Sequence, residues 1–442
     1  MKRFIYDTLL RWKESKDRKP VIIEGIRQCG KTWILKHFGE AEFNDVAYFN
    51  FEYDSRLQTV FEGDLNVSRI IKDLGILRNK SIQPGTTLLI FDEIQICPRA
   101  ITSLKYFCEN LPDLHVAAAG SLLGVAVAQM GNNVSFPVGK VRMLKMYPLS
   151  FPEFLISRDE ELLFEYLNEL SPDERVPDAF TGKLEEAYRE YLITGGMPEV
   201  VSSWVQNHDI GVVESLQSEI LSNYEKDFVK YASASEFPKL TLIWNAIPAQ
   251  LAKDNQKFIF SHVKQGMRAR DLEDSIQWLI SAGLIYKVEK IERPYIPIPT
   301  YGDSTCFKIY FSDVGLLRRM SRFPADVVFD TSSLTADMRG MVTESFVLTE
   351  LIANGFHRPY FWKSGGMAEV DYVIQEGVDV IPIEVKSARR TRSRSLTEYR
   401  KKYSPRIALR ASLRNIARHS DEHGEVLEIP LYLIWRLKAY LS

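Results

Sequence analysis

The sequence has only four cysteines, and they lie far apart, at Cys29, Cys97, Cys108 and Cys306. Their spacing gives neither a zinc-ligand pattern nor a disulfide framework, so we expect a reduced protein located in the cytoplasm. The seven histidines are dispersed and indicate neither a catalytic triad nor a zinc site. An excess of one charge is also missing, because 56 Lys and Arg face 58 Asp and Glu. Overall charge therefore points to no nucleic-acid or membrane partner.

Long apolar runs and internal repeats are missing as well. The longest weakly charged stretch, Val116–Phe136, contains glycine, serine, glutamine and asparagine residues. A bilayer would leave these polar groups without partners, so we interpret the stretch as a buried strand followed by a helix. The N-terminus MKRFIYDTLLRWKESKDRK alternates charged and apolar residues, unlike a signal peptide. We therefore expect no membrane partner.

What is present indicates several domains. The chain has 442 residues, 45% of them hydrophobic and 26% charged, which suits two to four packed cores. Four apolar runs of strand length alternate with helical patterns in the first 150 residues: Pro20–Gly25, Val46–Glu52, Thr86–Glu93 and Leu114–Ser121. This alternation predicts an α/β fold with a parallel sheet that helices cover on both faces.

The pattern changes twice further along the chain. From Phe151 to about Phe237 it is helical and charged, and LEEAYREYLITGG is its clearest amphipathic helix. Residues 237–320 contain apolar positions at helical spacing, a glycine turn and the strand Leu284–Val288, which is how a winged helix ends. In the last third, the helix MVTESFVLTELIANG precedes the strand-like segments AEVDYVIQEG and VIPIEVKSA.

A phosphate-binding motif lies between the first strand and its helix. The residues Gly25, Ile26, Arg27, Gln28, Cys29, Gly30, Lys31 and Thr32 match the Walker A pattern of a P-loop, G-x-x-x-x-G-K-[ST]. The glycines let backbone N–H groups converge on phosphate oxygens at a helix N-terminus. Lys31 is expected to reach the β- and γ-phosphates, and the Thr32 hydroxyl to bind Mg²⁺. The motif therefore predicts ATP and Mg²⁺ as cofactors, with Cys29 as a small filler.

An acidic pair follows the strand LLIFDE about sixty residues later. Asp92 is expected to hold Mg²⁺, directly or through water, and Glu93 to polarise the attacking water. A surface acidic pair is the alternative, but the order and context of the two motifs favour a catalytic site. Ser121 ends the next strand, where a polar sensor of the γ-phosphate would lie. A serine that only opens a helix is the alternative there.

Several motifs together resemble a prokaryotic family of AAA-superfamily ATPases with a C-terminal domain called DUF4143. They are GIRQCGKT, LLIFDEIQ, YPLSFPEFL, YLITGGMPEVV, KIYFSDVGLL and EVDYVI…IPIEVKS, in the family's order over nearly the whole chain. The resemblance implies an AAA-type core (1–155), a helical lid (156–236), a winged-helix-like domain (237–320) and a restriction-endonuclease-like DUF4143 domain (321–442).

The resemblance also implies a homo-oligomer, because a neighbouring subunit's arginine usually completes the site in this superfamily. The family usually has Gly-Arg after the sensor strand, whereas this chain has Gly139-Lys140, with Arg142 two residues further on. Arg142 is a candidate for that arginine, and a solvated basic residue is the alternative.

A second constellation lies near the C-terminus. Asp371 and Glu384-Val-Lys386 fit the D…(D/E)-x-K pattern of restriction-endonuclease-like folds, and Glu344 on the preceding helix would add a third carboxylate. In a strand, Glu384 and Lys386 lie on one face. Two carboxylates could hold a metal that activates water, with lysine supporting the nucleophile. An ordinary amphipathic strand, or a nuclease-like fold kept as a binding module, are the alternatives.

The segment 386–418 is basic, with twelve Lys and Arg against the single acid Glu398. Such a block suits DNA or RNA, although a solvated helix face is the alternative. We therefore expect an ATPase whose nucleotide state controls a nucleic-acid-facing C-terminal half. An ATP-regulated metal-dependent nuclease and a nucleotide switch or scaffold for a protein partner are the other hypotheses.

Overall fold

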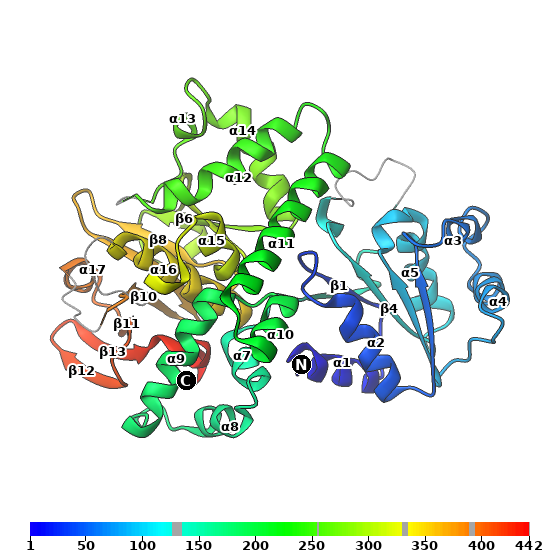
Figure 1. The fold of residues 1–442 in the computed structure, drawn as a ribbon, viewed down its shortest axis with the longest axis horizontal. Coiled ribbons are helices and arrows are strands. Elements are labelled where there is room, and N and C mark those ends of the chain that lie inside the picture. The colour runs from blue at the N-terminus through cyan, green and yellow to red at the C-terminus, as the bar shows by residue number, and fades with distance from the viewer. Residues whose placement is uncertain (126–134, 254–255, 329–334, 389–393, 442) are drawn as a thin grey trace. The chain divides into compact units, whose positions relative to one another are not determined.

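The computed structural model describes residues 1–125, 135–253, 256–328, 335–388 and 394–441. The chain divides into two compact units (Figure 1). The first unit consists of residues 2–147 with 281–284, and the second of residue 1 with 148–280 and 285–442. Among the described helices, none has both the length and the apolar character needed to cross a bilayer.

A five-stranded parallel sheet forms the centre of the first unit, in the order β2-β3-β4-β1-β5. Its strands are β1 (Val21–Glu24), β2 (Asp45–Asn50), β3 (Thr87–Asp92), β4 (His115–Gly120) and β5 (Arg142–Lys145). The first four were predicted from their apolar runs, whereas the short, mostly exposed β5 was not. Strand β4 lies between β1 and β3, so Ser121 directly after it lies between the ends of those two strands.

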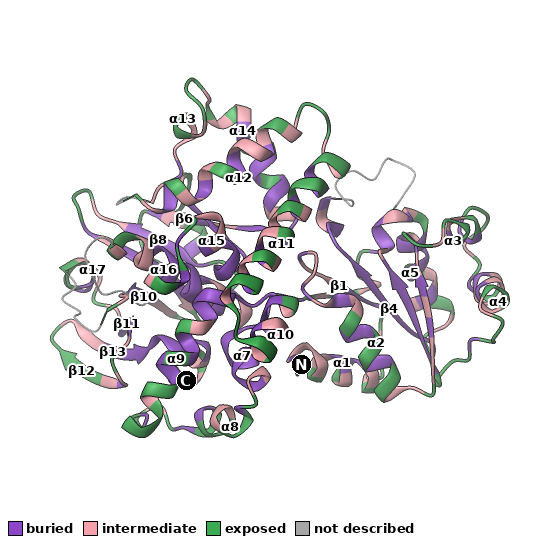
Figure 2. Ribbon diagram, in the orientation of Figure 1, coloured by how far each residue is buried: buried purple, intermediate pink, exposed green. Residues whose placement is uncertain are grey.

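Helices cover both faces of this sheet. They are α1 (Ile5–Glu14), α2 (Lys31–Glu42), α3 (Arg56–Val60), α4 (Val67–Leu77) and α5 (Pro98–Asn110), with the 3₁₀ turn η1 (Ile94–Ile96). The helix expected after β4 falls largely on residues 126–134, outside the described residues. The central strands β1, β3 and β4 are mostly buried, and Figure 2 shows much of the outer surface of α4 exposed, which is the amphipathic pattern of a covering helix.

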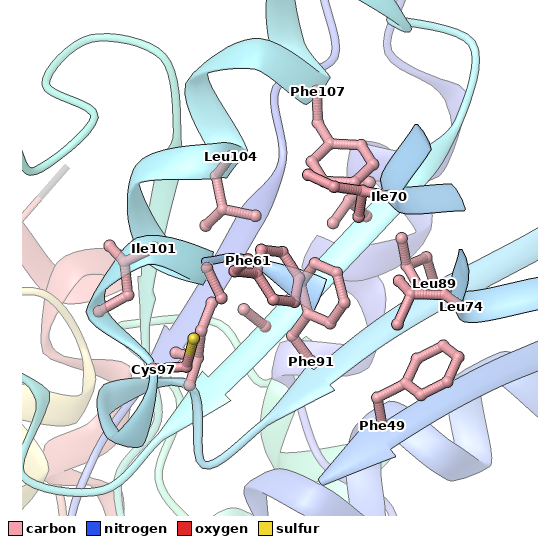
Figure 3. Packing of buried hydrophobic residues seen from close by; sticks show 14 of the residues in the cluster. Phe49, Phe61, Ile70, Leu74, Leu89, Phe91, Cys97, Ile101, Leu104 and Phe107 are labelled. Carbon is pink, nitrogen blue, oxygen red and sulfur yellow. The ribbon is translucent and has the colours of Figure 1, made fainter. Parts of the chain in front are cut away.

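The two faces of the sheet use alternate residues of each strand. On one face, Phe49 and Phe91 join side chains of α4 and α5, such as Ile70 and Leu104, in one apolar core (Figure 3). On the other face α2 approaches so closely that a Cβ on Gly39 would lie 2.7 Å from Val46 Cγ2. Close packing on both faces fixes the carboxyl ends of β1 and β3, where the loop 25–32 and the acidic pair Asp92 and Glu93 lie.

The second unit begins with helices, and further helices lie between and after its strands. They are α7 (Phe151–Ser157), α8 (Glu161–Glu169), α9 (Asp178–Thr194), α10 (Pro198–Asn207), α11 (Ile210–Tyr231), α12 (Phe237–Leu251), α13 (Phe260–Val263), α14 (Ala269–Ser281), α15 (Val314–Met320), α16 (Ala336–Ala353), α17 (Arg394–Tyr403) and α18 (Leu437–Leu441). The long amphipathic helix expected at LEEAYREYLITGG is α9, which ends at Gly195 with φ 70°.

An eight-stranded mixed sheet completes the second unit, in the order β12-β13-β11-β10-β9-β8-β6-β7. Its strands are β6 (Ile285–Ile291), β7 (Gly302–Phe311), β8 (Tyr360–Lys363), β9 (Glu369–Glu376), β10 (Asp379–Val385), β11 (Ile407–Ser412), β12 (Ala417–Asp421) and β13 (Gly424–Pro430). Strands β8, β9 and β10 form an antiparallel meander, and β11 pairs parallel to β10 after the crossover helix α17.

The antiparallel hairpin β6–β7 follows helix α14 and a glycine turn, the order expected for a winged helix. However, β6 also pairs parallel to β8 of the C-terminal sheet. The hairpin therefore belongs to one sheet with the strands after residue 320, and the separate winged-helix domain at 237–320 stays a prediction. This shared sheet brings β7 residues near the C-terminal carboxylates.

Candidate active site

The loop Gly25–Thr32 joins β1 to α2, so it lies at the carboxyl end of a parallel strand and at a helix N-terminus. Both glycines are needed here. A Cβ on Gly25 would lie 2.2 Å from Met146 O, and Gly30 has φ 96°, in the left-handed region. The loop thus has the backbone shape that places N–H groups around an anion.

Lys31, the first residue of α2, points its ammonium group back into the loop. Its Nζ donates to the carbonyls of Gly25, at 2.8 Å, and Ile26, at 2.7 Å. The side chain is buried, so the positive charge lies where phosphate oxygens would meet the backbone N–H groups. This location fits the predicted contact of Lys31 with the terminal phosphates.

Thr32 and Asp92 meet although sixty residues separate them. Thr32 Oγ1 donates to Asp92 Oδ2 at 2.9 Å, and the Tyr48 hydroxyl donates to the same oxygen at 2.6 Å. Asn50 Nδ2 lies 3.4 Å from it. A hydroxyl and a carboxylate that converge in this way are oxygen ligands of the kind that Mg²⁺ prefers, so the residues present fit the ion.

Tyr48 and Asn50 were missed from the sequence. They lie on β2, whose residues 48 and 50 are in register with Ile90 and Asp92 of the neighbouring β3. Burial, and then the hydrogen bond to Asp92, raise the pKa of the Tyr48 phenol above its ordinary value, so the phenol stays a hydrogen-bond donor. Two polar side chains at alternate positions near the end of a strand were the available signal.

Glu93 follows β3 in the left-handed conformation, with φ 50° and ψ 43°. Its Oε2 accepts from Ser121 Oγ at 3.0 Å and from Gln95 Nε2 at 2.5 Å. The structure thus joins Glu93 to Ser121, the predicted sensor, across neighbouring strands. Gln95 is the residue of this group that sequence reasoning missed.

Other residues of the loop pack into the protein. Ile26 and Cys29 are buried, and the Cys29 carbonyl accepts from Arg3 Nη1 at 3.0 Å, which agrees with Cys29 as a filler. Gln28 has φ 65°. Arg142 begins β5 and is exposed, so its role as a completing arginine stays a prediction.

The second constellation comes together in the second unit. Glu344 lies on α16, Asp371 on β9 and Glu384 on β10, with Lys386 directly after β10. Lys386 Nζ lies 2.6 Å from Glu384 Oε1, so the two side chains share one face as predicted. Asp371 Oδ2 accepts from the Val385 backbone at 2.7 Å. Burial, and then the charges of Glu344 and Glu384, raise the pKa of Asp371 well above its ordinary value.

Three further residues belong to this group and were missed. Lys308 on β7 lies with its Nζ 2.6 Å from Oε1 of Glu369, and its Nζ donates to Gln256 Oε1 at 3.0 Å. Gln256 Nε2 in turn donates to Glu344 Oε1 at 3.1 Å. Glu369 alternates with Asp371 in one strand and could have been found from that spacing. Lys308 and Gln256 had no comparable signal, because they come from distant segments.

A divalent metal, which a nuclease-like fold would imply, does not fit this arrangement as it stands. Among the described residues, no group of three or more His, Cys, Asp or Glu side chains is placed to hold a metal ion. In the second unit the carboxylates are instead engaged by lysines, Glu369 by Lys308 and Glu384 by Lys386.

Fewer basic side chains of the segment 386–418 are available to bind nucleic acid than its sequence suggests. Arg389, Arg390 and Arg392 lie outside the described residues. Four arginines of the segment pair with acids outside it: Arg400 with Asp421, Arg406 with Asp379, Arg410 with Glu428, and Arg418 with Asp173 and Glu425. The predicted excess of positive charge is therefore partly neutralised by the fold.

Three family models match the sequence. One described as an AAA domain matches residues 17–155, and one described as a domain of unknown function (DUF4143) matches residues 339–432. Another domain of unknown function (DUF8612) matches residues 185–327. No curated protein matches the chain.

Some solved structures match the chain at low sequence identity and with low TM-scores. The Walker-type ATPase PABY2304 of Pyrococcus abyssi is 16% identical with a TM-score of 0.43, over 72% of this chain and 95% of that chain. The ORC1 protein of Aeropyrum pernix in complex with DNA is 14% identical with a TM-score of 0.29, over 74% and 92%. AMPPCP-bound DnaA from Aquifex aeolicus is 12% identical with a TM-score of 0.26, over 63% and 86%. At these TM-scores the likenesses say nothing of function.

Proposed function

Because the chain belongs to the AAA-type P-loop ATPases that carry a C-terminal DUF4143 domain, we propose that its loop 25–32, Asp92 and Glu93 bind and hydrolyse ATP with Mg²⁺. The observation that carries this proposal is the convergence of Thr32 and Asp92, at 2.9 Å, beside the inward-pointing ammonium of Lys31. The carboxyl ends of β1 and β3 thus bring the Lys31 ammonium, the Thr32 hydroxyl and the Asp92 carboxylate into one site.

Each side chain then has a defined task. The loop N–H groups and Lys31 would hold the phosphate oxygens, and the Thr32 hydroxyl and the Asp92 carboxylate would hold Mg²⁺. Bound Mg²⁺ neutralises charge on the phosphates. Tyr48, through its hydrogen bond at 2.6 Å, fixes the orientation of the Asp92 carboxylate.

Glu93 orients the attacking water and accepts its proton. In the structure its Oε2 is held by Gln95 and Ser121, so the carboxylate is positioned by two neutral donors. A general base has to lie within hydrogen-bond reach of the proton that it accepts, and these two contacts hold the Glu93 carboxylate in place directly after β3. Ser121, directly after β4, is also the residue that would sense the γ-phosphate.

The test compares nucleotide binding with turnover in three variants. We expect Lys31→Ala to lose ATP binding and Glu93→Gln to bind ATP without turnover. Lys105→Ala, which removes an exposed lysine of α5 in the same unit, is the matched control and should change neither. Undiminished turnover in both site variants would overturn the assignment of this site.

The second part of the proposal is that nucleotide state controls a nucleic-acid-facing C-terminal half. It is supported by the exposed face of α17, which carries Arg394, Lys401 and Lys402. Lys402 Nζ also lies 5.1 Å from the centre of the Tyr403 ring. Cations next to aromatic rings suit phosphate contact combined with base stacking.

Linkage gives the test of this second part. If DNA or RNA binding is coupled to nucleotide state, ATP must change nucleic-acid affinity by the same factor by which nucleic acid changes ATP affinity. We expect the double variant Lys401→Glu with Lys402→Glu to bind DNA or RNA more weakly and with a smaller dependence on salt concentration. Lys72→Glu on α4 is a control of similar exposure in the other unit. If nucleic acid leaves both ATP affinity and turnover unchanged, the proposed coupling is wrong. That result would favour a nucleotide switch that binds a protein partner.

The domain organisation belongs to the same proposal. We place an AAA-type core at 1–155, a helical lid at 156–236, a winged-helix-like region at 237–320 and the nuclease-like domain at 321–442. A homo-oligomer in the cytoplasm, with the site completed by an arginine of a neighbouring copy, is the arrangement we would test by the concentration dependence of turnover.

A further inference from the structure

A lysine lies inside the carboxylate group of the second unit. We call the four acids Glu344, Glu369, Asp371 and Glu384 the C-terminal cluster. The Lys308 side chain is only 1% exposed, and its Nζ lies 2.6 Å from Glu369 Oε1. It approaches the cluster from β7, a strand outside the span that matches DUF4143.

Lys308 is held in the cluster on more than one side. Its Nζ donates to Gln256 Oε1, and the same amide donates through Nε2 to Glu344. The Tyr310 hydroxyl, from the same strand, lies 3.3 Å from Glu344 Oε2. The ammonium thus links the acid on β9 with the acid on α16 through one glutamine.

The surroundings keep this ammonium charged. Burial by itself lowers the pKa of Lys308, but the charges of Glu344, Glu369 and Asp371 outweigh burial and raise the pKa above its ordinary value. A buried positive charge that faces three carboxylates cancels much of the attraction that would draw in another cation.

We propose that the ammonium of Lys308 is the resident cation of the C-terminal cluster, in the place that a divalent metal would need. The carboxylates are then neutralised by the chain itself, and the cluster is an ion network that holds β7, β9 and α16 together. A phosphodiester bound nearby would meet no metal-activated water at this cluster. The inference does not rest on ATP binding in the first unit.

One acid of the cluster, Glu384, has an oxygen that could still bind a metal, and the experiment below tests for this. Glu384 is 3% exposed, and its Oε2 has no hydrogen-bond partner within the described residues. Its other oxygen pairs with Lys386. A metal that used Glu384 and Asp371 despite Lys308 is therefore the competing outcome.

The experiment measures Mn²⁺ binding by calorimetry without nucleotide, on the full chain with Asp92→Asn to remove the P-loop carboxylate. We expect no saturable Mn²⁺ site in this parent protein. Adding Lys308→Met should create one site, at least tenfold tighter than any binding to the parent, and a further Asp371→Asn should abolish it. Lys363→Met is the matched control, because Lys363 also pairs with Glu369, at 3.1 Å, but is 34% exposed and should create no site.

Two results would overturn the proposal. One is saturable Mn²⁺ binding by the parent that Asp371→Asn removes, and the other is a folded Lys308→Met protein that gains no site. Circular dichroism checks the fold of each variant. If Lys308→Met does not fold, the parent decides alone: identical Mn²⁺ titrations with and without Asp371→Asn support the inference, and a loss of binding contradicts it.

Discussion

The P-loop site and the C-terminal cluster both combine lysine with carboxylates, but they use the lysine in opposite ways. Lys31 donates to backbone carbonyls, and the side chains that donate to Asp92 are the neutral groups of Thr32, Tyr48 and Asn50. In the cluster, the ammonium of Lys308 lies directly on a carboxylate. The neutral donors around Asp92 leave the place of a cation to an incoming ion, whereas the cluster fills that place with a lysine of the chain.

A third place in the molecule shows another way in which a buried acid avoids an unpaired negative charge. Glu350 on α16 is 1% exposed, and the Phe151 backbone donates to its Oε1 at 2.8 Å. Burial raises its pKa from 4.5 to about 8, although the Phe151 hydrogen bond opposes the shift, and the nearby Glu153 adds to it. At neutral pH this carboxyl group therefore keeps its proton. All three places contain acids, but the surroundings of the acids differ: neutral donors at Asp92, the ammonium of Lys308 in the cluster, and a retained proton at Glu350.

The largest expected effect tests the site that is open to a cation. Glu93→Gln removes the base while keeping the hydrogen-bonding shape, so turnover should fall about 10²- to 10⁴-fold with ATP binding retained. Steady-state turnover and a fluorescent-nucleotide titration measure the two separately. The matched control is Glu369→Gln in the cluster, which should leave turnover within a factor of two. Equal losses in both variants would erase the distinction between the two regions.

The next largest effect tests the C-terminal cluster, where the Lys308 ammonium takes the place of a metal ion. Lys308→Met removes the buried ammonium from the cluster and leaves its acids to repel one another, so the free energy of unfolding at pH 7 should fall by about 3–5 kcal/mol. Lys363→Met removes a more exposed partner of the same Glu369 and should cost at most about 1 kcal/mol. Urea unfolding of both variants provides the measurement. A cost for Lys308 no larger than that for Lys363 would show that the buried ammonium is not what holds the cluster.

How far the sequence predicted these places follows from how their residues are distributed. The P-loop is contiguous, and Asp92 and Glu93 end a recognisable apolar strand, so local pattern was enough. Tyr48 and Asn50 required the register of β2 against β3, which no local signal fixes. Lys308 reaches the acids because β6, the partner of β7, also pairs with β8, and the prediction of a winged helix at 237–320 did not include that pairing. Gln256 lies between α12 and α13, where no local pattern places it beside the acids.

The third effect is a pH dependence from Glu350. Its pKa is about 8 in the folded protein and near 4.5 when unfolded, so the folded state binds the extra proton between these values. Stability from this group is therefore full below pH 4.5 and is lost as pH rises to 8. Glu350→Gln keeps an acceptor for the Phe151 backbone but cannot ionise.

Relative to the parent, Glu350→Gln should consequently gain about 2 kcal/mol or more at pH 8 and little at pH 5. Unfolding free energies at both pH values measure this difference. Glu398→Gln, on the exposed face of α17, is the control and should show no such trend. A Glu350→Gln effect that is equal at the two pH values would mean that Glu350 is ionised in the folded protein.

The smallest effect concerns the neutral hydrogen-bond donors that orient the Asp92 carboxylate for Mg²⁺. Tyr48→Phe removes one hydrogen bond to Asp92 Oδ2, a loss of about 1 kcal/mol of positioning, so the Mg²⁺ concentration for half-maximal turnover should rise about five-fold. Maximal turnover at saturating Mg²⁺ should stay unchanged, because Glu93 is not touched. Tyr53→Phe removes a phenol that is 93% exposed just after the same strand and serves as the control. If Tyr48→Phe instead lowered the Mg²⁺ requirement, the phenol would be a competitor for the carboxylate oxygen, and the P-loop site would share with the C-terminal cluster a group that holds cations out.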